Sequence, residues 1–236
     1  MFRFHFPLPG SRGRALKPTL LPRLLPALLL SGMAQAAAPD PLGPLEGVRQ
    51  FMATFTPDPA ERSLLAYAGR EQLDWTATQN LFASQLHDAP NHYLEWRGHS
   101  ALGVAGPTFT VVRAATFLRA GQALLVLTRE WCAAGRCESR TTFAWQGPGG
   151  WKSAPEPSVI PLIQDTDFAV GTLPACLRGV TLGVQYVPAR QGTTLHALPL
   201  VPATAQQRCD SAGVNVTTAT RALRLNWTPG VGKFRR

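Results

Sequence analysis

Hydrophobic residues near the start of the chain recur with the period of an α-helix. One apolar stripe, at spacings of three or four, is made by Leu45, Val48, Phe51, Met52 and Phe55. We expect this helix to end before Pro57. The run Asp58-Pro59-Ala60-Glu61 then predicts the start of a second helix, because an acid, a proline and a glutamate stand at the positions that favour helix initiation. A third helix is predicted over about residues 77–87.

From residue 91 onward the hydrophobic pattern becomes that of β-strands. Strands rich in β-branched and aromatic residues are predicted at 92–97, 108–118, 122–131, 138–145 and 151–153. Glycine or proline clusters separate them, and such short connections predict an antiparallel meander. With the helices covering one face of this sheet, the expected fold class is α+β and dominated by β-structure.

The proline-containing segment 154–158 is the best candidate for a linker, and strand-like segments recur after it at 159–163, 180–187, 193–200 and 221–227. These boundaries predict a domain of helices and antiparallel sheet over residues 37–153 and a second, smaller β-rich unit over residues 159–236.

Residues 1–36 have the three parts of a secretory signal. A basic region precedes an apolar run of about ten residues between Leu24 and Met33, and the small-residue site Ala34-Gln35-Ala36 follows. The run is shorter than the roughly 20 residues that cross a bilayer. We therefore expect cleavage after Ala36 or Ala38, a secreted or periplasmic mature protein, and no membrane span after cleavage.

The net charge of +9 comes mainly from the two ends of the chain. Five basic residues and no acidic residue precede Ala37, and three of the last four residues are basic, whereas residues 37–232 hold 15 basic and 14 acidic residues. A body of balanced charge lacks the basic stripe of a nucleic-acid-binding protein. The chain also lacks the glycine-rich motifs that bind nucleotide phosphates, so we expect no cofactor.

All four cysteines follow the signal, and an even number in an oxidising compartment favours disulfides. Three pairings are open. We choose Cys132–Cys137, which flanks a glycine-containing turn, and Cys176–Cys209 for the remaining two. Cys132 and Cys137 have the spacing of half a zinc site, but no second pair completes it, so no metal is expected.

The densest cluster of residue types suited to acid–base catalysis includes His92, Glu95 and His99. In a strand, however, His92 and Glu95 point to opposite faces. Gly98-His99-Ser100-Ala101-Leu102 comes near the nucleophile elbow of hydrolases but lacks its last glycine, and glycine and proline follow where the elbow needs a helix. An envelope hydrolase that uses His92, Glu95, His99 or Ser100 is therefore the alternative function.

Four tryptophans lie on neighbouring predicted strands and form either a stacking surface or part of the core: Trp96, Trp131, Trp145 and Trp151. The average burial of tryptophan favours the core. With no converging catalytic set, the sequence favours an exported, disulfide-stapled, non-enzymatic protein. Its partner would be another envelope protein or a glycan.

Overall fold

The computed structural model describes residues 40–100, 108–133 and 136–236, and the predicted secretory signal lies outside them. Three short helices come first: α1 (Pro44–Thr54), α2 (Leu64–Arg70) and α3 (Trp75–Asn80). α2 begins at Ser63, whose hydroxyl accepts a hydrogen bond from the backbone N–H of Ala66. Asp74 caps α3 in the same way. Short polar side chains at these positions satisfy backbone N–H groups that have no partner within the helix.

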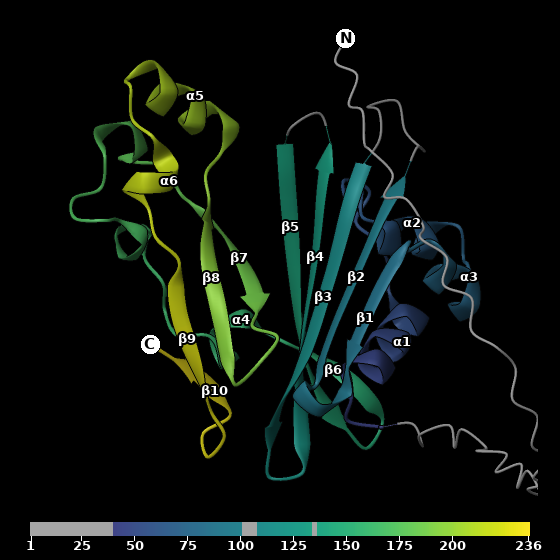
Figure 1. Cartoon of the computed structure of the whole chain (residues 1–236). Coiled ribbons are helices and arrows are strands. Elements are labelled where there is room, and N and C mark those ends of the chain that lie inside the picture. Colours follow the sequence, from purple (N-terminus) through teal and green to yellow (C-terminus); the bar gives the residue numbers. More distant parts are fainter. Residues whose placement is uncertain (1–39, 101–107, 134–135) are drawn as a thin grey trace, which may run out of the picture. The chain divides into compact units, whose positions relative to one another are not determined.

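The helices are followed by an antiparallel sheet of six strands in the order β1-β2-β3-β4-β5-β6, a simple meander (Figure 1). The strands are β1 (Ser84–Asp88), β2 (Tyr93–Ser100), β3 (Thr108–Arg119), β4 (Gln122–Ala133), β5 (Arg136–Gly147) and β6 (Gly150–Ala154). The pattern predicted β2 to β6 closely. The third helix was predicted too long, since α3 ends at Asn80 and residues 84–88 form the edge strand β1.

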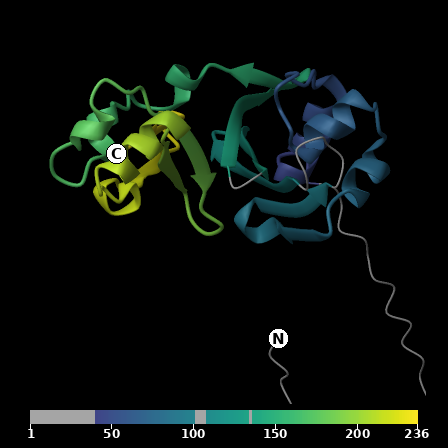
Figure 2. The same cartoon turned by 90° about the horizontal axis from the view of Figure 1, so that it is seen from above.

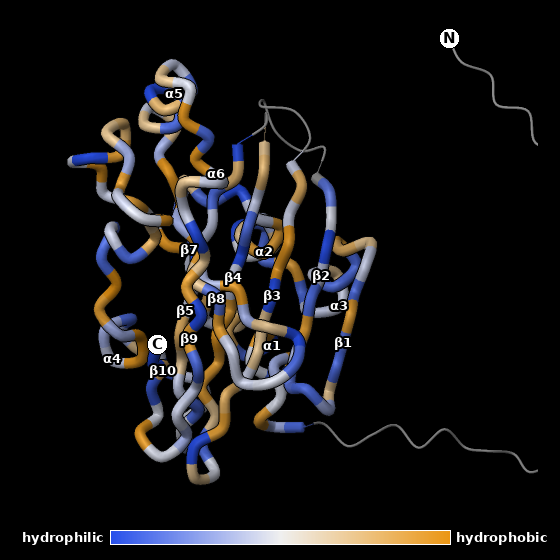
Figure 3. The backbone as a smooth tube through the Cα atoms, turned by 60° about the vertical axis from the view of Figure 1, so that its left-hand side comes forward, coloured by the Kyte–Doolittle hydropathy of each residue, from blue (hydrophilic) through white to orange (hydrophobic). Residues whose placement is uncertain are grey.

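Both faces of this sheet are covered. On one face, the helices pack on a hydrophobic cluster that includes Val48, Leu65, Leu94 and Trp96. Because side chains alternate along a strand, neighbouring residues of β2 serve opposite faces, and Tyr93 belongs to the cluster on the other side. β3 and β4 are consequently buried over most of their length, and hydrophobic stretches run through the middle of the sheet (Figure 3).

The second sheet has four antiparallel strands in the order β10-β9-β8-β7. They are β7 (Gly183–Pro188), β8 (Thr194–Leu200), β9 (Leu223–Thr228) and β10 (Lys233–Arg235). The segments before and between these strands carry the helices α4 (Glu156–Val159), α5 (Ala203–Ser211) and α6 (Val216–Ala219), and 3-10 turns at Asp165–Phe168 and Ala175–Leu177. A further 3-10 turn, Ala89–Asn91, joins β1 to β2 in the first sheet. Residues 159–163 were expected to be extended, but α4 occupies their beginning.

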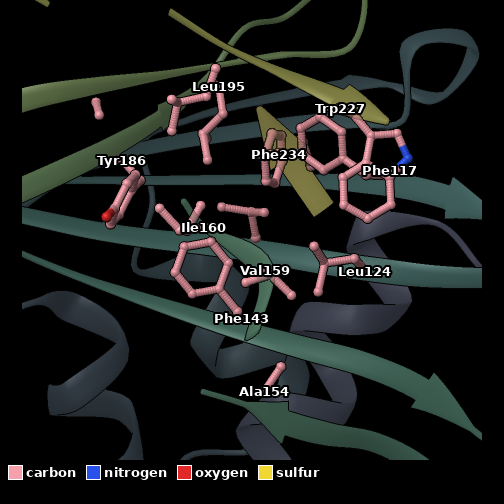
Figure 4. Packing of buried hydrophobic residues seen from close by; sticks show 14 of the residues in the cluster. Phe117, Leu124, Phe143, Ala154, Val159, Ile160, Tyr186, Leu195, Trp227 and Phe234 are labelled. Carbon is pink, nitrogen blue, oxygen red and sulfur yellow. The ribbon is translucent and has the colours of Figure 1, made fainter. Parts of the chain in front are cut away.

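The face of the six-stranded sheet away from the helices meets the second sheet, so the first sheet lies between the helices and β7 to β10 (Figure 2). A single cluster takes side chains from both sheets, and Phe117, Trp227 and Phe234 pack together within it (Figure 4). Two hydrogen bonds also cross: the Trp227 indole donates to the carbonyl of Leu118, and the Thr128 hydroxyl donates to that of Tyr186. Residues 38–236 therefore form one compact unit.

Candidate functional site

A groove lies between the C-terminal half of α1 and strands β5 and β6. Its volume is about 260 Å³, and its walls are Phe51, Thr54, Phe55, Thr56, Thr142, Ala144, Trp151 and Ser153. We call it the Trp151 groove. Pockets that enclose a whole small molecule typically hold about 300–1,000 Å³, so this one suits a side chain or a single ring.

The local sequence explains why these residues meet. Phe51 and Phe55 are four residues apart, so they lie on one side of the helix end, with ring centroids 4.6 Å apart. Trp151 and Ser153 are two residues apart on β6, so their side chains lie on the same face of the sheet. The tight β5–β6 hairpin depends on Gly150, whose φ of +94° is one that glycine adopts readily.

Next to the wall residues Phe51 and Phe55 lies a buried ion pair between Arg129 of β4 and Glu61, which precedes α2. Arg129 Nε is 2.7 Å from Glu61 Oε1 and Nη2 is 3.2 Å from Oε2, and the side chains are only 5% and 1% exposed. Ser63 donates a further hydrogen bond to Glu61, at 2.6 Å. The two opposite charges are thus paired within the protein.

The guanidinium of Arg129 also orders the walls of the groove. It lies 5.2 Å from the ring centroid of Phe51 and 5.1 Å from that of Phe55, within the distance of a cation–π contact. Its Nη1 donates to the hydroxyl of Thr142 at 3.0 Å. Thr142 accepts in that bond, so its own hydroxyl hydrogen can still be donated to a ligand.

The indole of Trp151 also carries a buried polar group. Its Nε1–H is buried and has no hydrogen-bond partner within the described part of the chain. A buried donor without a partner costs about 1–3 kcal/mol. The aromatic walls of the groove suit an aromatic or aliphatic group.

The residues considered for catalysis do not converge. Glu95 accepts hydrogen bonds from Tyr93, Arg97 and Arg113. Burial alone would raise the pKa of Glu95, but these hydrogen bonds and the positive charge of Arg113 lower it below its ordinary value. Such a carboxylate is a poor base at neutral pH.

The remaining candidates are spread along β2. His99 stacks on Phe109 with ring centroids 5.0 Å apart. The side chain of Ser100 lies outside the described atoms. His92 precedes the first residue of β2, whereas Ser100 is its last. At about 3.3 Å per residue, the two lie roughly 25 Å apart, too far for a nucleophile and its base.

His92 lines a second pocket, of about 320 Å³, between the two sheets. Phe117, Thr193 and Trp227 form other parts of its wall. The imidazole Nδ1 of His92 is 3.6 Å from the Asp40 carboxylate, beyond a normal hydrogen bond. The backbone at His92 adopts φ +49°, in the left-handed region.

The candidate tryptophans have different surroundings. Trp96 is fully buried and donates its indole N–H to His87. Trp131 is 4% exposed, and Trp145 packs against the cluster between the sheets. Trp151 is the member of this set that lines a groove. The structure thus places all four residues in or against the core, and Trp151 borders a groove as well.

Both disulfides are present and join the predicted partners, Cys132 with Cys137 and Cys176 with Cys209. Among the described residues, the potential metal ligands that come together are Glu130, Cys132 and Cys137. The sulfur atoms of the two cysteines are bonded to each other, so they cannot act as thiolate ligands.

Comparisons with known protein families, curated proteins and solved structures find no match for this chain. None of the described helices combines the length and hydrophobicity that spanning a bilayer requires.

The sequence reasoning missed the pair of Glu61 and Arg129. It assigned Glu61 to the start of a helix that in fact begins after Ser63. The available signal was an arginine that follows a hydrophobic run, Ala123 to Leu127, in a strand that is buried over most of its length. Such a charge needs a partner in the fold, but 68 residues separate it from Glu61.

Proposed function

We propose that this chain is an exported, disulfide-stapled, non-enzymatic protein of the cell envelope or the extracellular space, and that it binds another molecule through the Trp151 groove. The observation that carries the proposal is a groove with aromatic walls, formed by Phe51, Phe55 and Trp151, beside the edge strand β6. A ligand of this groove would insert a ring or aliphatic group between Phe51 and Trp151.

Two features support export. Residues 1–36 have the pattern of a secretory signal, and all four cysteines that follow it are joined in disulfides. Disulfides persist in oxidising compartments and are rare in the cytosol. Mass spectrometry of the secreted or periplasmic material tests this part. We expect an N-terminus at residue 37 or 39 and no free thiol, and intact leader or four free thiols would contradict it.

Binding fits the groove better than catalysis does. Its walls offer aromatic rings, hydroxyl groups and one indole N–H, and the nearest buried charges, Glu61 and Arg129, are committed to each other. Catalysis of hydrolysis needs a base or an activated nucleophile within reach of the substrate. The rings and hydroxyl groups of the walls are well suited to recognition, because aromatic surfaces supply contact area and a few polar groups fix the orientation of a ligand.

A solution titration tests the groove directly. We would add N-acetyl-phenylalanine amide to ¹⁵N-labelled mature protein and follow the indole N–H resonances of its six tryptophans. The resonance of Trp151 should move, because the probe brings both a ring and carbonyl acceptors. Trp151→Phe should weaken binding of the probe, observed through its own signals. Trp75→Phe is the matched control, since Trp75 packs on Trp96 outside the groove. Unchanged resonances at millimolar probe, or a shift at Trp227 instead, would refute the groove as the site.

A further inference from the structure

Strand β6 is an edge of the six-stranded sheet, and it borders the Trp151 groove. It pairs with β5 on one side, and its backbone makes no other hydrogen bond within the described residues. Hydrogen-bonded and non-hydrogen-bonded pairs alternate along an antiparallel ladder, so every second residue of β6 directs both its N–H and its C=O outward. Lys152 and Ser153 are exposed, which leaves this edge open to another chain.

We propose that the ligand of the Trp151 groove is an extended peptide segment that adds to β6 as a further strand. This inference rests on the proposed function and names the class of partner. An added strand would run about 4.8 Å from β6, with alternate side chains on the same face as Trp151 and Ser153. An aromatic or aliphatic side chain on that face enters the groove. Backbone hydrogen bonds supply affinity and the groove supplies specificity, as in other complexes formed by strand addition.

The charge on β6 selects among possible occupants. Lys152 lies at the centre of the strand, on the face opposite the groove, and it has no ion pair among the described residues. If two copies of the protein paired through β6 about its centre, the two Lys152 side chains would lie opposite each other and repel. In a partner strand with an acidic residue between two aromatic or aliphatic residues, the acidic side chain would lie on the face of Lys152 and the other two on the face of the groove. The occupant is therefore an acidic segment of a different polypeptide and not a second copy.

The capped peptide Thr-Phe-Glu-Phe-Thr has this pattern and serves as the probe. Its affinity for the mature protein would be measured by calorimetry and compared with that of N-acetyl-phenylalanine amide. We expect at least tenfold tighter binding of the peptide and slower hydrogen exchange at the β6 amides. A peptide N-methylated at alternate residues keeps its side chains but loses backbone donors, so it should bind no better than the capped amino acid.

A charge exchange tests the role of Lys152. Lys152→Glu should lower the affinity for the glutamate peptide and raise that for the peptide with lysine in its place, each by roughly two- to fivefold, the strength of one cross-strand pair. Lys233→Glu, on β10 of the other sheet, is the matched control and should change neither affinity.

The outcomes separate the two proposals. If the capped amino acid binds at Trp151 but N-methylation does not weaken the peptide, strand addition is wrong and the groove binds isolated side chains or rings. If neither probe binds, the proposed function itself fails. A dimer in analytical ultracentrifugation that Trp151→Ala dissociates would assign the edge to a second copy and overturn this inference.

Discussion

The ion pair beside Phe51 and Phe55 gives the sharpest prediction about stability. Glu61 and Arg129 are almost completely buried and share two hydrogen bonds. Removing one partner leaves the other as an uncompensated buried charge, which costs about 3–5 kcal/mol. For a protein of this size, each kcal/mol lowers the melting temperature by about 2–4 °C. Arg129→Met or Glu61→Leu should therefore lower it by about 6–20 °C.

The double variant distinguishes a charge effect from a packing effect. With both charges gone, no buried charge lacks a partner, and replacement by hydrophobic residues of similar volume is often neutral. We expect Glu61→Leu with Arg129→Met to be more stable than either single variant, measured by thermal and urea unfolding with both disulfides oxidised. Arg140→Met removes the solvent-exposed ion pair with Asp58 and should lower the stability much less than either single variant, because water screens that pair. If the two single effects simply add, the account of the pair given above is incorrect.

Three further results are expected. Glu95 has a lowered pKa in the folded protein, so the stability that its ionised form contributes is complete above the ordinary pKa of 4.5 and is lost as the pH falls through the folded pKa. The stability advantage of the natural protein over Glu95→Gln should therefore shrink between neutral and acidic pH, measured by urea titration at each pH. Replacing both cysteines of the Cys176–Cys209 bridge, which spans 33 residues, should cost about 4 kcal/mol, against about 2 kcal/mol for Cys132–Cys137, which spans 5; equal losses in unfolding experiments would contradict the chain-entropy argument. A fragment that ends at residue 153 should bind a hydrophobic dye, because it exposes Phe117 and Phe143, whereas a monomeric fragment that does not bind the dye would support independent domains.

The last of these experiments also concerns the predicted division of the chain. The linker at 154–158 and the two separate units remain a prediction. The shared hydrophobic cluster and the hydrogen bond between Trp227 and Leu118 join the two sheets, so separate folding of the two units would have to do without these contacts. Each sheet would have to expose a large apolar face to water if it were alone.

Local sequence patterns predicted the structure correctly where a single local preference, such as strand periodicity or a short turn, decides it. The meander of β2 to β6 followed from strand periodicity and short turns, and Cys132–Cys137 followed from the turn between its cysteines. Helix starts were less certain, because Asp58-Pro59-Ala60-Glu61 resembles a helix start as closely as the sequence around Ser63 does. Burial decided between them: Glu61 has to reach Arg129, and Ser63 caps the helix instead.

By itself, the sequence determined the class of the fold and the positions of most strands, because spacing along the chain controls both, and it favoured the pairing of cysteines that the structure has. The tertiary structure decided which of four similar tryptophans borders a groove. Trp96 and Trp131 are on inner strands and almost completely buried, whereas Trp151 is on the edge strand β6, where it is partly buried and borders the groove at the end of α1. Contacts between residues far apart in sequence set that difference, and neither hydrophobicity nor local periodicity encodes them.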